Sequence, residues 1–270
     1  MAKLSVCAEC FFTNLPFEKR MEKIASIGYK HIEFWHPEGT FDGKGVDFSQ
    51  AKNAKSLKKA AKDNGITIND FAFSAWDGSI GGNATNDKDH TKYLEQTKKM
   101  LDFANEIGCK KGIILSGMAQ KKLSKEKMIA NLTKAYTKAV KLAEAAKITL
   151  VLEPLNTLVD HAGFFLDGTE ESVKIIRKIN SPNLKLLYDV YHMQIMQGNI
   201  IDFLSKNIDI VGHFHSAGVP GRAELFDTEI NYPAIIKAID KLGYKGCFGL
   251  EYFPKLDHTK SLKQTLKYLA

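Results

Sequence analysis

The sequence predicts an α/β fold, a single (β/α)₈ TIM barrel that spans residues 1–270 as one domain. Three observations predict it. Short apolar runs typical of strands alternate with longer amphipathic segments typical of helices, eight times over. The length of 270 residues is close to that of such barrels, roughly 250. Finally, four runs in the second half each end on a metal-binding side chain, at the edge where the active sites of these barrels lie.

The strand candidates are mostly continuous apolar runs, as expected when helices cover one face of a strand and the barrel interior the other. In chain order they are residues 4–10, 31–35, 66–74, 112–116, 148–153, 184–191, 210–215 and 247–252.

The helix candidates fill the intervals between these strands. The first opens at Pro16, and the others are residues 49–63, 87–106, 124–146, 169–179, 200–206, 233–242 and 259–269. Proline suits the opening turn at Pro16 and Pro233, and Thr169 fits an N-cap followed by two glutamates. Several helices stop at a glycine, which is a C-cap signal: Gly28, Gly65, Gly108 and Gly243.

A doubly wound open sheet is the alternative architecture. The sequence contains neither a GxGxxG after the first strand nor a GxxxxGK[ST] motif, so nucleotide-binding open sheets are disfavoured. The longest loops, residues 37–48, 75–86 and 216–232, all leave the carboxyl end of a predicted strand. This is the edge that carries substrate-binding loops in a barrel.

Composition excludes several classes of function. The net charge of +7 comes largely from lysines spread over amphipathic segments, which indicates solvated helix faces and no nucleic-acid partner. No apolar run reaches the ~20 residues of a membrane helix, and no secretory signal opens the chain, so we expect a cytoplasmic protein. Cys7 and Cys10 have CxxC spacing, but residues three apart on a strand point to opposite faces, so we expect reduced thiols.

The strand-end side chains are Glu153, Asp189, His215 and Glu251. Carboxyl ends of parallel strands meet at one edge of a barrel, so these four groups are predicted to converge. Three buried carboxylates are costly unless a cation neutralises them. The set of three carboxylates and one imidazole predicts one divalent metal ion, with Mn²⁺, Mg²⁺ or Co²⁺ favoured over structural zinc.

The two glutamates also suggest acid/base catalysis. A divalent ion that bridges a carbonyl and the adjacent hydroxyl makes the α-proton acidic and stabilises an enediolate. Glu153 and Glu251 come from the fifth and eighth strands, so they are placed to flank a substrate and to remove and return that proton. Asp189 and His215 would then only hold the metal.

Four further residues are candidate substrate contacts. His192 lies three residues beyond Asp189, where its imidazole either donates to a substrate oxygen or binds a backbone carbonyl. Arg222 lies in a Gly/Pro-rich loop at the mouth of the site, and its fork of donors suits oxygen-rich substrates. Trp76 belongs to a Gly-rich loop that would cover the site, and Asn156 follows Glu153 closely. His213, two residues before His215, is predicted to be structural.

A family resemblance lies in four segments of the second half and in the opening helix and strand. The segments are EPLNTLVDHAGFFL (153–166), SPNLKLLYDVYHMQIMQGN (181–199), GHFHSAGVPGRAE with EINYP (212–224 and 229–233), YKGCFGLEYFP (244–254) and LPFEKRMEKIASIGYKHIEFW (15–35). They resemble the hydroxypyruvate isomerase family of the xylose-isomerase-like TIM barrels. The resemblance implies a metal-dependent aldose–ketose isomerase that converts hydroxypyruvate, or a related hydroxy-keto acid, to tartronate semialdehyde or its equivalent. It also implies a homodimer or homotetramer.

The chain departs from that family at two positions. The segment that usually reads NTRVDHPG has Leu158 in place of the arginine, and the third metal ligand, often glutamine, is His215. Histidine there resembles the ketose 3-epimerases, so a 3-epimerase with the same metal site is the alternative. An inosose isomerase or dehydratase and a non-enzymatic sugar-binding barrel are more remote. An endonuclease-IV-like nuclease is disfavoured, because residues 227–229 read Asp-Thr-Glu where an Asp-x-His is expected.

Overall fold

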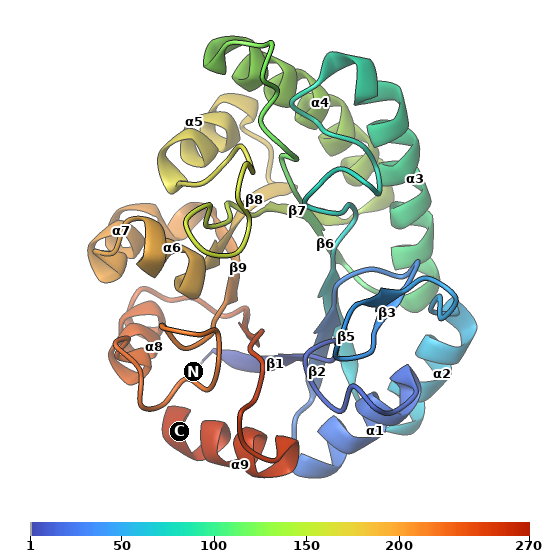
Figure 1. Cartoon of the computed structure of the whole chain (residues 1–270), viewed down its shortest axis with the longest axis vertical. Helices are drawn as coiled ribbons and strands as arrows, with labels where there is room; N and C mark the ends of the chain where they lie inside the picture. Colours follow the sequence, from blue (N-terminus) through green and yellow to red (C-terminus); the bar gives the residue numbers. More distant parts are fainter. Residues whose placement is uncertain (1) are drawn as a thin grey trace.

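The structure is a computed structural model, and residues 2–270 of it are described. Eight parallel strands form an inner ring, and helices form an outer ring around it (Figure 1). The strands are β1 (Lys3–Cys7), β2 (His31–Phe34), β5 (Thr67–Phe71), β6 (Lys111–Ile114), β7 (Thr149–Leu152), β8 (Leu184–Asp189), β9 (Val211–His215) and β10 (Cys247–Leu250). The α/β barrel that the sequence predicts is therefore confirmed.

The strand order shows how the ring closes. Neighbours follow the order β5-β2-β1-β10-β9-β8-β7-β6, so the first strand pairs with the last. The remaining gap, between β5 and β6, is bridged just beyond the end of β5, where the Phe73 amide donates to the Ile113 carbonyl at 2.9 Å. All these pairings are parallel, so every carboxyl end lies at the same rim of the barrel.

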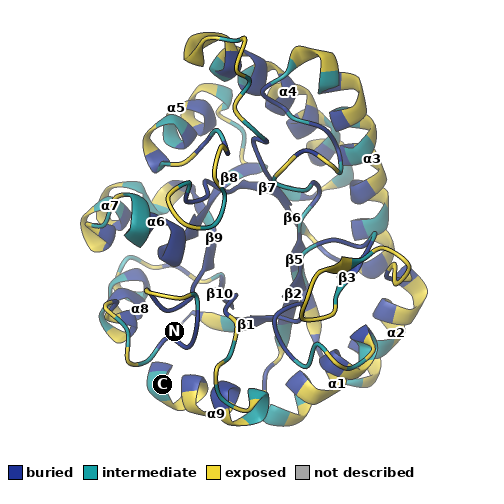
Figure 2. Cartoon of the chain, in the orientation of Figure 1, coloured by how far each residue is buried: buried dark blue, intermediate teal, exposed yellow. Residues whose placement is uncertain are grey.

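The helices cover the outside of the ring. They are α1 (Phe17–Ile27), α2 (Ala54–Asp63), α3 (His90–Ile107), α4 (Lys125–Ala146), α5 (Thr169–Ile179), α7 (Ile200–Asn207), α8 (Tyr232–Lys241) and α9 (His258–Leu269). In α4 the residues Leu132, Tyr136, Ala139 and Ala143 recur every three or four positions and are buried. Figure 2 shows the same pattern around the barrel, with buried inner faces and exposed outer faces.

Several predicted boundaries were wrong, each for a local reason. The first strand stops at Cys7, because the Cys10 amide turns back to the Cys7 carbonyl at 3.1 Å. The second helix begins only at Ala54, where Asn53 caps it by accepting from the Ser56 amide. The α5 helix has Gly168 as its N-cap, with Thr169 as the first helical residue.

Two elements at the upper rim were not predicted at all. A hairpin of β3 (Thr40–Phe41) and β4 (Val46–Asp47) occupies the loop after β2. A short helix, α6 (Val190–Met196), follows β8 directly, so the sixth strand ends at Asp189 and does not reach Tyr191. Short 3₁₀ turns at Asp87–Asp89 and Ile208–Ile210 precede α3 and β9. Both unpredicted elements border the site described next.

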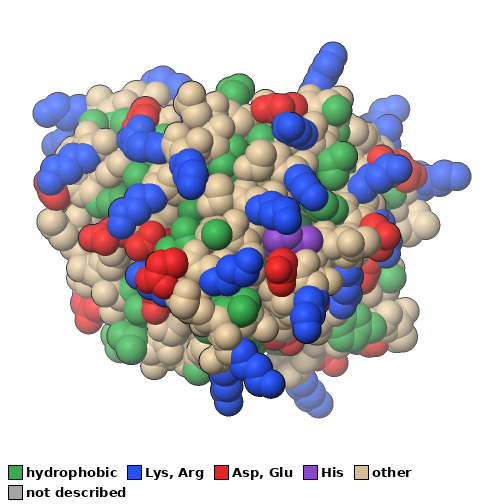
Figure 3. Space-filling view, turned by 90° about the horizontal axis from the view of Figure 1, so that it is seen from above, with side chains coloured by type: hydrophobic (Ala, Val, Ile, Leu, Met, Phe, Trp, Pro, Cys, Tyr) green, Lys and Arg blue, Asp and Glu red, His purple; other side chains and the backbone are tan. Residues whose placement is uncertain are grey.

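The surface charges and the hydropathy of the helices were also compared with the predictions. Figure 3 shows Lys and Arg side chains spread over one face and interspersed with Asp and Glu, without a continuous basic stripe on that face. Among residues 2–270, no helix combines the length and apolarity that crossing a membrane requires.

Candidate metal centre

Four side chains from consecutive strands meet at the carboxyl rim. Asp189 and His215 end β8 and β9, and they are paired in register; Glu153 and Glu251 follow β7 and β10 by one residue. One ligand atom of each group lies within 4.8 Å of the other three. All four side chains are buried, with residue exposures of 1–7 %. The structure thus brings together the four residues that the sequence singled out.

The chemistry of this cluster fits a divalent cation. His215 Nδ1 lies 3.2 Å from Glu153 Oε1 and 3.5 Å from Glu251 Oε2, so one imidazole is shared between two carboxylates. Burying three carboxylates around a single imidazole is unfavourable unless a further positive charge is present. Oxygen donors with one nitrogen are the ligands that Mn²⁺ and similar ions accept. The four groups could therefore hold a metal ion.

The two glutamates have opposite proton affinities. Burial raises the pKa of Glu153, and the negative charge of Glu251 adds to that effect. Burial also opposes ionisation of Glu251, but the neighbouring His215 and Arg222 outweigh it and lower the pKa of Glu251. Without a bound cation, one glutamate of the pair therefore holds a proton readily and the other stays ionised.

The two remaining members of the cluster also depart from their ordinary proton affinities. Burial and the charge of Glu153 raise the pKa of Asp189 to about 7. For His215, burial favours the neutral ring, but Glu251, Glu33 and Glu153 together raise its pKa well above the ordinary value. In the absence of a cation, the cluster thus retains protons that a metal ion would displace.

Arg222 lies closer to the cluster than the predicted position at the mouth. Its Nη2 donates to Glu251 Oε2 at 2.7 Å, and its guanidinium lies 5.3 Å from the centre of the Tyr191 ring. The backbone of Arg222 adopts φ of 51°, a conformation that is strained for a non-glycine residue and that concentrates at functional sites. Its Nε is buried and has no hydrogen-bond partner among the described residues. One donor of Arg222 is therefore left for a ligand.

His192 also faces the cluster, and α6 places it there. Asp189 Oδ1 caps α6 by accepting from the Tyr191 amide at 2.7 Å and from the His192 amide at 3.3 Å. His192 Nε2 then lies 3.4 Å from Asp189 Oδ2, while its Nδ1 lies 2.7 Å from the amide nitrogen of Asn156. Burial lowers the pKa of His192 well below its ordinary value, so the ring is neutral. Since Asn156 donates to Nδ1, the ring proton is on Nε2 and faces Asp189.

Asn156 differs from its predicted role as a substrate contact. Its amide nitrogen binds His192 and also donates to Asp160 at 2.6 Å, while its oxygen accepts from the amides of Val159 and Asp160. It is fully buried and does not line the cavity. Its contacts are those of a residue that orients His192.

A cavity of about 580 Å³ opens next to the cluster. Glu153, His215 and Glu251 form part of its wall together with His192 and Arg222. Much of the remaining lining is apolar and comes from the first half of the chain: Trp35, Val46, Phe48, Trp76, Ile113 and Leu115. The cavity therefore has one polar side and one hydrophobic side, as small-molecule sites commonly do.

Two wall residues do more than the sequence predicted. Trp35 contributes an apolar surface, and its indole N–H also donates to Glu251 Oε1 at 2.6 Å. His161 was not predicted, although it follows the fifth strand in the same loop as Asn156. Its ring contacts Trp76 and His192 at centroid distances of 4.9 and 5.4 Å, and its Nδ1 has no partner among the described residues.

A second buried group of polar side chains adjoins the first. Glu33 and Asp70 flank His213, whose Nε2 lies 3.1 Å from Glu33 Oε2 and 3.2 Å from Asp70 Oδ2. Glu33 Oε1 also lies 3.2 Å from His215 Nε2. Sequence reasoning missed both acids. The signal was available, because an acid inside an apolar strand such as HIEF requires a buried partner.

The two cysteines of the CxxC pair and Leu158 are further residues that the sequence singled out. Cys7 and Cys10 are buried free thiols as expected, but they lie side by side and hydrogen-bond, because the turn after β1 folds Cys10 back. The prediction that they point to opposite faces was therefore wrong. Leu158 is 72 % exposed and does not line the cavity.

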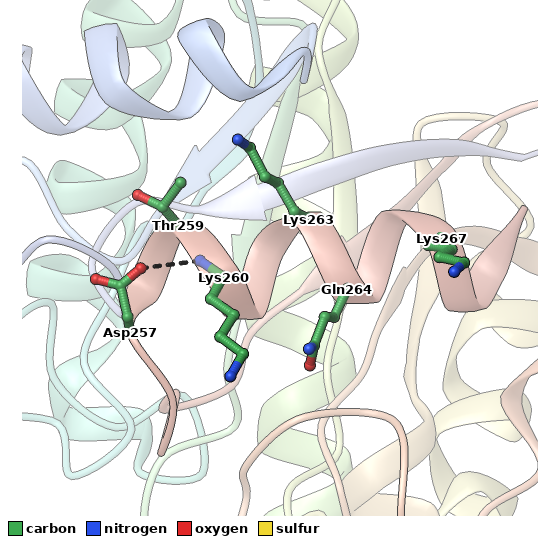
Figure 4. A pocket seen from close by; sticks show the side chains of 6 residues that line it. All are labelled: Asp257, Thr259, Lys260, Lys263, Gln264 and Lys267. Atoms are coloured by element: carbon green, nitrogen blue, oxygen red, sulfur yellow. Dashed lines mark hydrogen bonds between the residues drawn. The ribbon is translucent and has the colours of Figure 1, made fainter.

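Another hollow lies on the outer surface along α9 (Figure 4). Its walls are helical side chains, chiefly Lys260, Lys263 and Lys267. Its one drawn hydrogen bond is the helix cap, in which Asp257 accepts from the Lys260 amide. Its lysine ammonium groups spread outward, in contrast to the converging groups at the barrel rim.

Comparison with known proteins places these features in context. The family of xylose isomerase-like TIM barrels matches residues 21–270. The chain is 29 % identical to hydroxypyruvate isomerase of Escherichia coli (strain K12) over 255 residues, which cover 94 % of this chain and 95 % of that protein. It is 27 % identical to 2-oxo-tetronate isomerase of Cupriavidus necator over 272 residues, with 100 % of both chains covered.

Among solved structures, an L-ribulose 3-epimerase is similar, with a TM-score of 0.81 and 18 % identity; the similarity covers 100 % of this chain and 93 % of that one. At that identity the likeness shows a shared fold and nothing finer.

Proposed function

Because the chain belongs to the xylose isomerase-like TIM barrel family, we propose that it is a metal-dependent isomerase of a short hydroxycarbonyl acid. The proposed reaction interconverts the ketose-type and aldose-type forms, as in hydroxypyruvate and tartronate semialdehyde. The observation that carries the proposal is the convergence of Glu153, Asp189, His215 and Glu251, with two glutamates of opposite proton affinity. The similarity to hydroxypyruvate and 2-oxo-tetronate isomerases supports the substrate class.

In this proposal Glu153, Asp189, His215 and Glu251 hold one divalent ion, with Mn²⁺, Mg²⁺ or Co²⁺ as candidates. When bound, such an ion polarises a carbonyl and the neighbouring hydroxyl and makes the α-proton acidic. The protein supplies the proton transfer. One glutamate removes the proton from one carbon, and the other returns a proton to the adjacent carbon.

The surrounding residues explain why the two glutamates act unequally. Glu251 receives the indole N–H of Trp35 and the guanidinium of Arg222, and both contacts stabilise its ionised form. At Glu153 burial outweighs the opposing effects of His215 and Arg222, so without a bound cation this carboxyl holds a proton more readily. Glu251, which is ionised, is suited to abstract the proton. Glu153, whose affinity for a proton is the higher of the two, is suited to receive a proton and to return it.

Substrate binding in this proposal uses Arg222, His192 and Trp76. The free Nε of Arg222 is available to the substrate carboxylate, and His192 Nε2–H can donate to a substrate oxygen. Trp76 and the other apolar residues that line the cavity would exclude water from the reacting carbons. Asn156 takes the role of orienting His192.

The test is proton exchange in D₂O followed by NMR, with added Mn²⁺ and with hydroxypyruvate, 2-oxo-tetronate and a free ketose as substrates. We expect deuterium incorporation at the carbon next to the carbonyl of a hydroxy-keto acid, together with an aldehyde product. The exchange should disappear in EDTA and in Glu251→Gln. Exchange that persists under both conditions refutes the mechanism.

A ketose 3-epimerase is the second candidate function. It is favoured by His215 at the third ligand position, where the resemblance of the sequence points to ketose 3-epimerases. The same experiment separates the two functions. Deuterium at C3 of a free ketose, with no aldehyde product from the keto acids, would establish the epimerase and exclude the isomerase.

A further inference from the structure

The second buried group, Glu33, Asp70 and His213, contains two carboxylates that lie inside the barrel and do not belong to the ligand cluster. Glu33 and Asp70 are at most 1 % exposed, and so is His213 between them. Buried carboxylates persist where they are paired and hydrogen-bonded. Their arrangement relative to His215 indicates what they do.

The two nitrogens of His215 face different neighbours. Nδ1 faces the ligand cluster, at 3.2 Å from Glu153 Oε1, whereas Nε2 faces Glu33 Oε1 at 3.2 Å. A neutral imidazole carries one proton, so the nitrogen that binds a metal must be the unprotonated one. A carboxylate at Nε2 keeps the proton there and leaves the Nδ1 lone pair free.

The contact between Glu33 and His215 is close but not ideally aligned. The separation of 3.2 Å is within hydrogen-bonding range, yet the Nε2–H bond does not point directly at Oε1. Both atoms are buried and have no other hydrogen-bond partner among the described residues. A hydrogen bond between them would satisfy both groups at once, whereas leaving them apart costs two buried polar atoms.

Glu33 is itself held in place from two directions. Its other oxygen, Oε2, lies 3.1 Å from His213 Nε2, and Asp70 supports the same nitrogen at 3.2 Å. On β10, Gly249 leaves the necessary space. A Cβ at Gly249 would lie 2.2 Å from Glu33 Oε1 and 2.7 Å from His215 Cδ2. The absence of a side chain at 249 is therefore what lets the carboxylate reach the imidazole.

We propose that Glu33 is a positioning residue that accepts the Nε2–H of His215 and so fixes the tautomer and direction of this ligand. His213 and Asp70 extend the chain of contacts and hold Glu33. The inference rests on the proposed function, since it assigns Glu33 its role through a metal at the neighbouring cluster. Glu33 itself contacts no substrate and no reacting atom in this proposal.

The experiment measures Mn²⁺ affinity directly, by calorimetry and by EPR of free Mn²⁺, in the full-length chain. Wild-type protein is expected to bind one Mn²⁺ per chain. Glu33→Gln is expected to bind it about 10- to 100-fold more weakly, as is typical when the outer partner of a ligating histidine is removed. At saturating Mn²⁺, the kcat of the variant should return to within a few-fold of wild type, because Glu33 acts only through His215.

A matched control is Glu9→Gln. Glu9 is also a buried glutamate of the first half of the chain, but it contacts Lys52 and the Phe41 amide, not His215. Its loss should lower thermal stability and leave Mn²⁺ affinity unchanged. Nitrogen-15 NMR of the histidines gives a further readout. The His215 Nε2–H signal of the wild type should be lost or shifted in Glu33→Gln and retained in Glu9→Gln.

The possible results are distinguishable. Unchanged Mn²⁺ affinity in folded Glu33→Gln overturns the inference, as do two Mn²⁺ per wild-type chain, which would make the second group a metal site instead. If Glu33→Gln does not fold, Glu33→Asp decides, because it keeps the charge but draws the carboxylate back from His215 by one methylene; unchanged affinity there also overturns the inference. Absence of Mn²⁺ binding by the wild type would instead refute the proposed function.

Discussion

The two halves of the barrel carry different kinds of side chain at the same rim. In the second half, β7 to β10 end in or beside Glu153, Asp189, His215 and Glu251, which are groups that could bind metal. In the first half, the corresponding positions include Trp35 after β2 and Leu115 after β6, which line the cavity. The two acids on first-half strands that adjoin the cluster, Glu33 on β2 and Asp70 on β5, contact histidines of β9 and do not line the cavity.

This contrast indicates that the two halves of the barrel have different roles in the proposed site. The proposed chemistry is concentrated on one arc of the rim, while the other arc provides the wall and the supports. Two contacts join the halves: the indole of Trp35 reaches Glu251, and the carboxylate of Glu33 reaches His215. Because the ring pairs the first strand with the last, groups from opposite ends of the sequence lie close enough for such contacts.

The largest effect on proton exchange is expected at Glu153, which we compare with a carboxylate of the first half that lines the same cavity. Glu153→Gln should reduce proton exchange by about 10²- to 10⁴-fold, since a positioned acid or base contributes that much. Asp77→Asn is the control, because Asp77 lines the same cavity but is used by the amide and hydroxyl of Ser79. Its exchange rate should stay within a few-fold of wild type. Equal losses in the two variants would contradict the division between halves.

An intermediate effect is expected at the contact that joins the halves. Trp35→Phe keeps an aromatic wall but removes the 2.6 Å hydrogen bond to Glu251. A hydrogen bond to a charged group contributes about 1.5–3 kcal/mol, so kcat/KM should fall roughly 10- to 100-fold. Trp76→Phe, measured in the same assay, tests the other cavity tryptophan, whose ring contacts His161. We expect it to have a smaller effect, and the reverse order would show that the Trp35 indole N–H is unimportant.

The smallest expected effect is on stability and depends on pH. The pKa of Asp189 is raised to about 7 from an ordinary value of 3.8, so the folded protein binds this proton more tightly than the unfolded chain. Its contribution to stability therefore falls as pH rises from about 4 to about 7. In EDTA near pH 8, Asp189→Asn should remove this cost and raise Tm by roughly 2–4 °C for each kcal/mol gained.

The sign of the Tm difference between Asp189→Asn and the wild type is checked by changing the pH and by adding Mn²⁺. The advantage of Asp189→Asn should shrink near pH 4, where the wild-type carboxyl is protonated in both states, and it should reverse with saturating Mn²⁺. Asp209→Asn serves as a control, because the Asp209 carboxylate is solvent-exposed and its pKa is lowered by Arg177. A wild type more stable than Asp189→Asn in EDTA near pH 8 would contradict the prediction.

The sequence predicted the alternation of strands and helices well, because it rests on patterns local to each segment. It was less reliable where an element depends on one short-range contact. The α6 helix exists because Asp189 caps it, yet the run LLYDVYH resembles a continuous strand. Similarly, the β3–β4 hairpin has only two residues in each strand, too few for a recognisable pattern.

Prediction of the candidate site was limited in the same way, because contacts between distant residues have no local pattern in the sequence. Glu153, Asp189, His215 and Glu251 could be named from the sequence because parallel strands bring their carboxyl ends to one rim. Asn156 was predicted to contact substrate, but its side-chain amide binds His192 and Asp160, and only the positions of those residues in space reveal this.

By itself, then, the sequence determined the barrel and the four groups at its rim, because strand periodicity and strand ends are properties of position along the chain. Only the tertiary structure decided which nitrogen of His215 faces the cluster, that Trp35 donates to Glu251, and that Glu33 reaches β9. The reason is physical: hydrogen bonds and ion pairs act over about 3 Å, and closure of the ring brings within that distance residues far apart in sequence.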